Sequence, residues 1–141
     1  MSGENTATAI REAIEAFGRG DLEGAVAPFA DDAEYNEFGT GQTYKGKAQI
    51  RAANQGWMIA FPDAKAEVKT QIVTGDEVAL EVVWRGTHTG PLQSPAGTVP
   101  ATGRRVEVPS AIVATMRGGK VQSQRQYFNL ASLMQQLGLA G

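Results

Sequence analysis

The chain of 141 residues contains no cysteine and only one histidine, and it has no long hydrophobic run. Without cysteine, disulfide bonds, thiolate catalysis and cysteine-based metal sites are excluded. A single histidine also excludes a histidine-rich metal site, so we expect no bound metal. No stretch approaches the roughly 20 consecutive apolar residues that a membrane-spanning helix needs.

An excess of charge of either sign is also missing. The 13 Lys and Arg residues nearly balance the 15 Asp and Glu residues, which leaves a net charge of -2 at pH 7. This balance argues against nucleic acid or an anionic membrane as a partner, since both bind basic surfaces. The polar N-terminus lacks the apolar core of a secretory signal, so we expect a cytoplasmic protein. Length and composition fit one globular domain over residues 1–141.

Three helices are predicted in the first part of the chain, because apolar residues recur there every three or four positions. The first helix ends at Gly18, and Asp21 is suited to cap the second. Pro28 does not fit a helix interior, so the second helix is short or ends in a distorted turn. The third runs from about residue 47 to 60 and ends before Pro62. The apolar stripes are Ile10, Ala13, Ile14 and Phe17, then Leu22, Ala25, Val26 and Phe29, and finally Ile50, Ala53, Trp57 and Phe61.

Strands are predicted in the rest of the chain, where apolar and polar residues alternate. In the second strand Ala66, Val68, Thr70 and Ile72 form one face. Consecutive antiparallel strands make a curved sheet, and the early helices cover its apolar face around a cone-shaped cavity. The predicted strands span 33–38, 65–72, 78–88, 105–116 and 120–129, and a last helical stripe covers 130–137.

His88 lies at the end of a strongly patterned strand, in the segment Trp84-Arg-Gly-Thr-His-Thr-Gly90. Its side chain titrates near neutrality, which makes it a candidate for proton transfer. If the strand stays regular, His88 faces the cavity together with Trp84, beneath a loop over residues 89–103. Loops longer than about 12 residues are often functional. The alternative is a histidine held by hydrogen bonds to this loop, whose prolines are Pro91, Pro95 and Pro100.

The order of elements and several short motifs resemble the nuclear-transport-factor-two-like fold, and in particular its SnoaL-like polyketide cyclase, or ester cyclase, branch. The resemblance covers nearly the whole chain and is carried by the order and spacing of the motifs together. These motifs are Phe29-Ala-Asp-Asp-Ala33, Gly46, Phe61-Pro-Asp63, Gly86-Thr-His88-Thr-Gly90, Pro100-Ala-Thr-Gly-Arg104, Gly119-Lys120, Tyr127-Phe128-Asn129 and the segment from Leu133 to Gly138.

The resemblance implies an α+β cone, in which N-terminal helices cover a curved antiparallel sheet and a short C-terminal helix follows. It also implies a cofactor-free protein, a small-molecule ligand in the cone and a homodimer through the sheet. Polyketide cyclases of this type close a ring by intramolecular aldol condensation. Related folds include steroid isomerases, epoxide hydrolases, dehydratases and proteins without a known reaction, so the fold alone does not fix the function.

Glu37 is a candidate catalytic base on the first strand. Alternation places it on one face with Ala33 and Tyr35, so Tyr35 is a candidate ligand contact. The resemblance to steroid isomerases implies a carboxylate near this place that removes a proton next to a carbonyl. The alternative is an exposed Glu37 on an edge strand, with Glu34, Asn36 and Phe38 facing inward.

Asn129 stands where many relatives carry the aspartate that partners the family's histidine. Asparagine cannot exchange a proton at neutral pH, but it can donate a hydrogen bond to a carbonyl or an oxyanion. Gln124 similarly replaces a glutamate found in relatives. The usual mechanism would then require Glu37 or another carboxylate. The alternative is that Asn129 caps the last helix.

The ligand contacts depend on which face of the last strand lines the cone. If it is the face of Asn129, Arg125 could bind a carbonyl or carboxylate and Tyr127 could donate a hydrogen bond. Otherwise Arg125 is a surface charge and Gln124 and Gln126 point inward. At least one face of this glutamine-rich strand fits a dimer interface.

Trp57 and Trp84 fit the core by their spacing, and Trp84 has the stronger claim to the pocket because it shares the face of His88. We therefore weigh a cofactor-free enzyme that forms an enolate of a carbonyl compound against two alternatives on the same fold. One is a small-molecule-binding protein with reduced catalysis, and the other is a dimeric scaffold. Epoxide hydrolysis is weaker, because it needs two aspartates around a pocket arginine and only Arg125 is easily placed.

Overall fold

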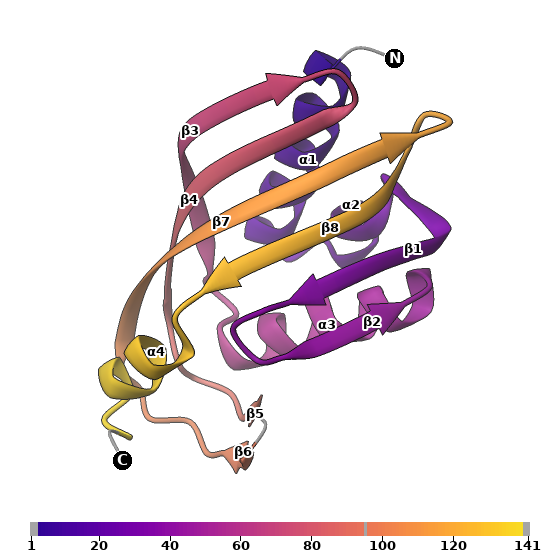
Figure 1. The fold of residues 1–141 in the computed structure, drawn as a ribbon. Coiled ribbons are helices and arrows are strands. Elements are labelled where there is room, and N and C mark those ends of the chain that lie inside the picture. The colour runs from indigo at the N-terminus through magenta and orange to yellow at the C-terminus, as the bar shows by residue number, and fades with distance from the viewer. Residues whose placement is uncertain (1–2, 95, 140–141) are drawn as a thin grey trace.

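The computed structural model describes residues 3–94 and 96–139. Pro95, which belongs to the predicted loop, lies outside the described residues, as do Met1, Ser2, Ala140 and Gly141. The described residues form an α+β fold in which three helices lie on one face of a curved sheet, which confirms the predicted fold class (Figure 1).

The main sheet has six strands in the order β2-β1-β8-β7-β4-β3. All neighbours are antiparallel except β1 and β8, which run parallel. The first strand of the chain therefore pairs with the last strand. In chain order the elements are α1 (Gly3–Gly18), α2 (Leu22–Val26), β1 (Phe29–Glu37), β2 (Gln42–Lys45), α3 (Lys47–Ala60), β3 (Lys65–Thr74), β4 (Glu77–Thr87), β5 (Leu92–Ser94), β6 (Gly97–Val99), β7 (Arg105–Arg117), β8 (Lys120–Phe128) and α4 (Leu130–Gln136).

Apolar side chains from the helices and from one face of the sheet make the core. Each fully buried large aliphatic side chain stabilises the fold by about 1.5–3 kcal/mol before the entropy of ordering is counted. The first cluster lies under α1 and includes Ile10, Val26, Ile50, Val78, Leu80, Val82, Ile112 and Val121. The second lies where α3, β7 and α4 meet, and consists of Ala60, Phe61, Leu92, Val106, Val108, Leu133 and Leu137.

The predicted helices are present, with one change at the second. Asp21 caps α2 by accepting a hydrogen bond from the backbone N–H of Gly24 (2.9 Å). Phe29 does not continue this helix, because Pro28 interrupts it and Phe29 instead begins β1. The predicted start of that strand at Ala33 was therefore four residues late. The short strand β2 was not predicted.

A bulge in β3 overturns the predicted face of that strand. Val68 pairs with Val82, but the next pairing joins Thr70 to Glu81, so one residue is inserted and the alternation reverses. Ile72 consequently lies on the outer face with 61% of its surface exposed. Val73, rather than Ile72, packs against the core.

The segment after β4 carries regular structure that was expected to be a loop. Strands β5 and β6 form a hairpin that projects beyond the end of the main sheet (Figure 1). Its base is fixed to the end of α3, because the backbone N–H groups of Thr89 and Gly90 both donate to the Ala60 carbonyl oxygen. A Cβ atom at Gly90 would collide with the carbonyl of Ile59, so only glycine permits this approach.

Candidate functional site

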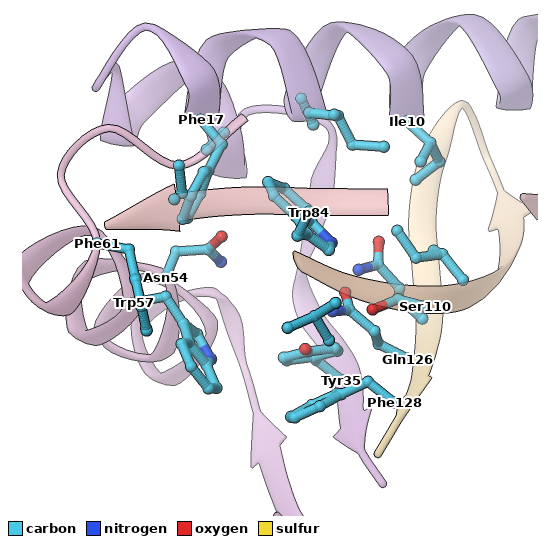
Figure 2. Close-up of a pocket in the computed structure, with 18 of the residues that line it drawn as sticks. Ile10, Phe17, Tyr35, Asn54, Trp57, Phe61, Trp84, Ser110, Gln126 and Phe128 are labelled. Atoms are coloured by element: carbon cyan, nitrogen blue, oxygen red, sulfur yellow. The ribbon is translucent and has the colours of Figure 1, made fainter. Parts of the chain in front are cut away.

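The site is a cavity between the helices and the inner face of the sheet (Figure 2). Its volume of about 130 Å³ is comparable with the roughly 150 Å³ that accommodates a benzene-sized ligand. The wall on the helix side comes from α1, α3 and the residue that follows α3, and it includes Ile10, Ile14, Phe17, Ile50, Asn54, Trp57 and Phe61. The wall on the sheet side includes Tyr35, Trp84, Val106, Val108, Ser110, Ile112, Gln124, Gln126 and Phe128.

Polar groups in the lining are few and mostly neutral. They are the hydroxyls of Tyr35 and Ser110 and the amides of Asn54, Gln124 and Gln126. The tryptophan N–H groups and Arg85 complete the set, but the guanidinium of Arg85 is paired with Glu67 (3.1 Å) and Glu107 (3.0 Å). The arrangement therefore suits a neutral, hydrophobic ligand that carries hydrogen-bonding oxygens.

Glu37 is buried directly behind this wall, with 2% of its surface exposed. Its Oε2 accepts hydrogen bonds from the Tyr35 hydroxyl and from Trp57 Nε1, both at 2.9 Å. Its Oε1 accepts from the Thr40 hydroxyl at 2.8 Å. Three donors therefore hold the carboxylate, as a buried charge requires. Glu37 itself does not line the cavity, but Tyr35 and Trp57 do.

The alternation of the first strand left open which face is buried, and in the structure it is the face of Glu37. Ala33, Tyr35 and Glu37 all lie on the buried side of β1, and Phe38 is half exposed. Burial, together with the nearby Glu37 charge, raises the pKa of Tyr35 well above its usual range. The same two causes raise the pKa of Tyr44, whose ring stacks on Tyr35. Both phenols are therefore neutral at physiological pH.

His88 does not face the cavity, which corrects the predicted orientation. Strand β4 ends at Thr87, and the His88 backbone pairs instead with Gly103 and Arg104 across the base of the 89–103 segment. The imidazole is fully buried, and its ring centroid lies 5.3 Å from that of Phe61. The alternative prediction, a histidine held by the loop, describes this geometry.

The hydrogen bonds of the His88 imidazole define which ring nitrogen carries the proton in the neutral form. The backbone N–H of Thr102 donates to Nδ1 at 3.1 Å, and the Thr102 hydroxyl lies 3.0 Å from the same atom. Nδ1 is thus an acceptor, which assigns the proton of the neutral ring to Nε2. Nε2 is buried without a hydrogen-bond partner. Burial lowers the pKa of His88, and the backbone of Gly90 has a smaller, opposite effect.

The candidate ligand contacts on the last strand require the face of Asn129 to line the cavity, but the opposite face lines it. Gln124, Gln126 and Phe128 line it, so Arg125 and Tyr127 lie on the outer face and do not contact a ligand there. Asn129 is exposed and caps α4, where its side chain accepts a hydrogen bond from the Ser132 backbone N–H (3.0 Å). This contact is the helix cap that the alternative prediction describes.

Three predicted contacts, Tyr35, Trp57 and Trp84, do line the cavity. Ser110 was missed, although the sequence carries a signal for it. In β7 every second residue from Val106 to Met116 faces inward, and Ser110 is the one polar residue of that series. Thr40, which fixes Glu37, had no signal, because it lies in a turn whose geometry the pattern does not specify.

A curved sheet covered by helices around one apolar cavity defines the class of nuclear-transport-factor-two-like, or ketosteroid-isomerase-like, cone proteins. The chain belongs to the SnoaL-like polyketide cyclase family, whose model matches residues 7–137. Comparison with curated proteins gives no match.

Solved structures agree with this assignment. AclR, a candidate hydroxylase from Streptomyces galilaeus, is 27% identical over 98% of both chains, with a TM-score of 0.81. IdmH, a candidate polyketide cyclase from Streptomyces antibioticus, is 29% identical over 94% of this chain and 97% of its own, with a TM-score of 0.77. A SnoaL-like protein from Jannaschia (24% identity, 99% and 94% coverage, TM-score 0.84) shares the fold.

Two features are absent from the part of the chain that the structure describes. No helix there is long and apolar enough to cross a membrane. No group of three or more His, Cys, Asp or Glu side chains is arranged there to hold a metal ion.

The buried environment of His88 predicts an NMR titration with an apparent pKa below the usual value of about 6.5. Because the folded state resists protonation, this group stabilises the fold fully above pH 6.5. That stability is lost as the pH falls through the lower folded pKa. The chain has one histidine, so its imidazole signal is unambiguous. A pKa at or above 6.5 would contradict the buried placement.

Because Asn129 caps α4, we expect its substitution to change the stability of the fold but not the binding of a ligand. Asn129→Ala should lower the free energy of unfolding by about 1 kcal/mol, because the Ser132 N–H loses its acceptor. Asn129→Asp should retain the cap and serves as the control. Chemical denaturation of the three proteins measures this. If the alanine variant is as stable as the native chain, the cap does not stabilise α4.

Proposed function

We propose that the chain is a cofactor-free enzyme of cyclase or isomerase type, which removes a proton next to a carbonyl group of a hydrophobic small molecule. One observation carries this proposal. The Tyr35 hydroxyl, at the cavity wall, donates to the buried carboxylate of Glu37 at 2.9 Å. The cavity is thus joined to a carboxylate through a single hydrogen bond, which is the connection that proton removal requires.

The proton moves in a relay. It leaves the substrate carbon for Tyr35 Oη, while the phenolic proton passes to Oε2 of Glu37. The C–H bond breaks, its electron pair becomes the enolate, and Glu37 becomes a neutral acid. Since the pKa of Tyr35 is raised, a free phenolate is unfavourable and the two transfers occur together.

Two outcomes follow from the enolate. In ring closure, its carbon attacks a second carbonyl of the same molecule, a C–C bond forms, and the resulting alkoxide takes the proton back through Tyr35. In isomerisation, the proton returns to a different carbon of the conjugated system. The apolar walls favour either step, because charge interactions are stronger where water is excluded.

A second candidate function is ligand binding without catalysis. It is favoured by the lining itself, because no Asp, Glu, His or Lys is among the described residues that line the cavity. In this case Glu37 has a purely structural role and holds the Tyr35 and Trp57 rings in place through its hydrogen bonds. The enzyme and the binding protein differ only in whether this carboxylate takes up a proton.

Proton exchange distinguishes the two candidates. We expect the native protein to accelerate hydrogen–deuterium exchange next to the carbonyl of 2-tetralone, a compact bicyclic ketone, as followed by NMR. Glu37→Gln should reduce this acceleration by roughly 100-fold or more, and Tyr35→Phe should interrupt the relay as well. Both tryptophans of the chain line the cavity, so their fluorescence reports whether each variant still binds the ketone.

Glu34→Gln is the matched control, because Glu34 lies on the same strand with its side chain on the opposite face. It should exchange protons as the native protein does. Binding of the ketone without accelerated exchange would support the second candidate. Accelerated hydrogen–deuterium exchange in both the Glu37→Gln and the Tyr35→Phe variants would contradict the relay.

The outer face of the sheet supports the predicted homodimer, which remains part of the proposal. Exposed aromatic and aliphatic side chains lie there, with Phe38 and Tyr127 stacked at 4.7 Å. Tyr127 pairs with Ala111 across β7 and β8 and borders a shallow groove on this face. Isolated apolar residues are common on surfaces, but a stacked pair beside a groove fits an interface better.

Sedimentation measures the dimer directly. We expect a particle of twice the 14.9 kDa chain mass, and Ala111→Arg should shift it to the monomer by placing a charge in the centre of the interface. Gln55→Arg, on the exposed side of α3, is the control. A native protein that is monomeric at all accessible concentrations would contradict the interface.

A further inference from the structure

Two hydrogen-bond donors at the cavity lack partners. The indole Nε1 of Trp84 and the hydroxyl of Ser110 are buried and form no hydrogen bond, although both residues line the cavity. Ser110 as a whole is only 7% exposed. Buried polar groups are rarely left unpaired, because the loss of hydration is not recovered. Each such group therefore points to a partner that arrives from outside the protein.

The strand register places these donors next to one another. Trp84 pairs with Val108 and Val82 pairs with Ser110, so Trp84 and Ser110 are diagonal neighbours on β4 and β7. Such neighbours lie within reach of an aromatic side chain. Figure 2 shows Trp84 and Ser110 on the same wall of the cavity, across from Trp57 of α3 and from Phe61, which follows α3.

Gln126 stands on the other side of Ser110. It pairs with Ile112, while Ser110 pairs with Phe128, so Gln126 is the diagonal neighbour on β8. Among the described residues, no hydrogen bond holds the Gln126 side chain. Its amide can therefore supply a third donor to a ligand in the cavity.

From this arrangement we infer that Trp84 Nε1, the Ser110 hydroxyl and the Gln126 amide form a binding site for a ligand oxygen, in a neutral ring compound that carries a carbonyl group. The donors are uncharged, so the site suits a carbonyl better than a carboxylate. The apolar surroundings accommodate the ring. This inference deepens the proposed function by naming what the cavity recognises, and it requires only that the cavity holds the ligand.

The oxygen bound here is distinct from the carbonyl that activates the reacting carbon. Ser110 on β7 and Tyr35 on β1 are separated by β8, which places their backbones roughly 10 Å apart. A ketone oxygen lies much closer than that to its own neighbouring carbon. Ser110 and Trp84 therefore act as positioning residues at the end of the ligand away from Tyr35 and Glu37.

A matched pair of probes tests the site. 2-Tetralone and tetralin share the same rings, but only the first carries a carbonyl oxygen. We expect the native protein to bind 2-tetralone about tenfold more tightly, the order expected from one or two neutral hydrogen bonds. Ser110→Ala and Trp84→Phe should each reduce this preference severalfold, while tetralin affinity under Ser110→Ala stays unchanged. Isothermal titration calorimetry measures all the affinities without relying on the tryptophans.

A stability measurement separates recognition from a structural role. Ser110→Ala should leave the unfolding temperature unchanged or raise it, because the hydroxyl has no partner to lose. Its loss of affinity for 2-tetralone should therefore occur without a loss of stability. Ser123→Ala on β8, which does not line the cavity, is the control.

The outcomes also separate this inference from the proposed function. A ketone preference that survives both Ser110→Ala and Trp84→Phe overturns the oxygen site, whatever Glu37→Gln does to exchange. A native protein without any ketone preference, including one that binds neither probe, overturns it as well. A preference that depends on Ser110 supports the oxygen site, whether or not the protein accelerates exchange.

Discussion

The position of β8 between β7 and β1 determines which side chains can meet in the cavity. Its antiparallel pairing with β7 brings Gln126 beside Ser110, and its parallel pairing with β1 sets Gln126 opposite Glu37. Because side chains alternate along a strand, a shift of one residue in either pairing would turn these groups to the outer face. The register of one strand therefore connects the donors on β4 and β7 with the carboxylate on β1.

Polar groups on the two sides of the cavity are satisfied to different degrees. The carboxylate of Glu37 accepts hydrogen bonds from three side chains, and each such bond to a charged group contributes about 1.5–3 kcal/mol. Ser110 and Trp84 Nε1 have no partner. The first side is thus complete without a ligand, whereas the second gains its hydrogen bonds only when a ligand or a rearranged side chain supplies an acceptor. This difference is why we place recognition at Ser110 and proton transfer at Tyr35 and Glu37.

The sequence predicts the fold better than it predicts the site, for physical reasons. Alternation over β1 correctly placed Tyr35 and Glu37 on one face, because that strand stays regular beyond Ala33, but it left open which face is buried. The same reasoning failed for Ile72, because a bulge inserts one residue into β3 and the alternation of apolar and polar residues does not reveal a bulge. It failed for His88 because β4 ends one residue earlier and the chain turns into the 89–103 segment. Strand ends and bulges are set by tertiary contacts rather than by the local pattern.

The roles of His88 and Asn129 bear on where proton transfer can occur. A histidine that shuttles protons needs a nitrogen that faces the ligand, but Nδ1 of His88 is occupied by Thr102, and His88 is not among the described residues that line the cavity. Asn129 caps a helix at the surface. In the structure both side chains thus contact the framework and not the cavity. Under the proposed function the acid–base work moves across the sheet to β1, and the ligand must point its reacting carbon toward Tyr35, with a second oxygen near Ser110.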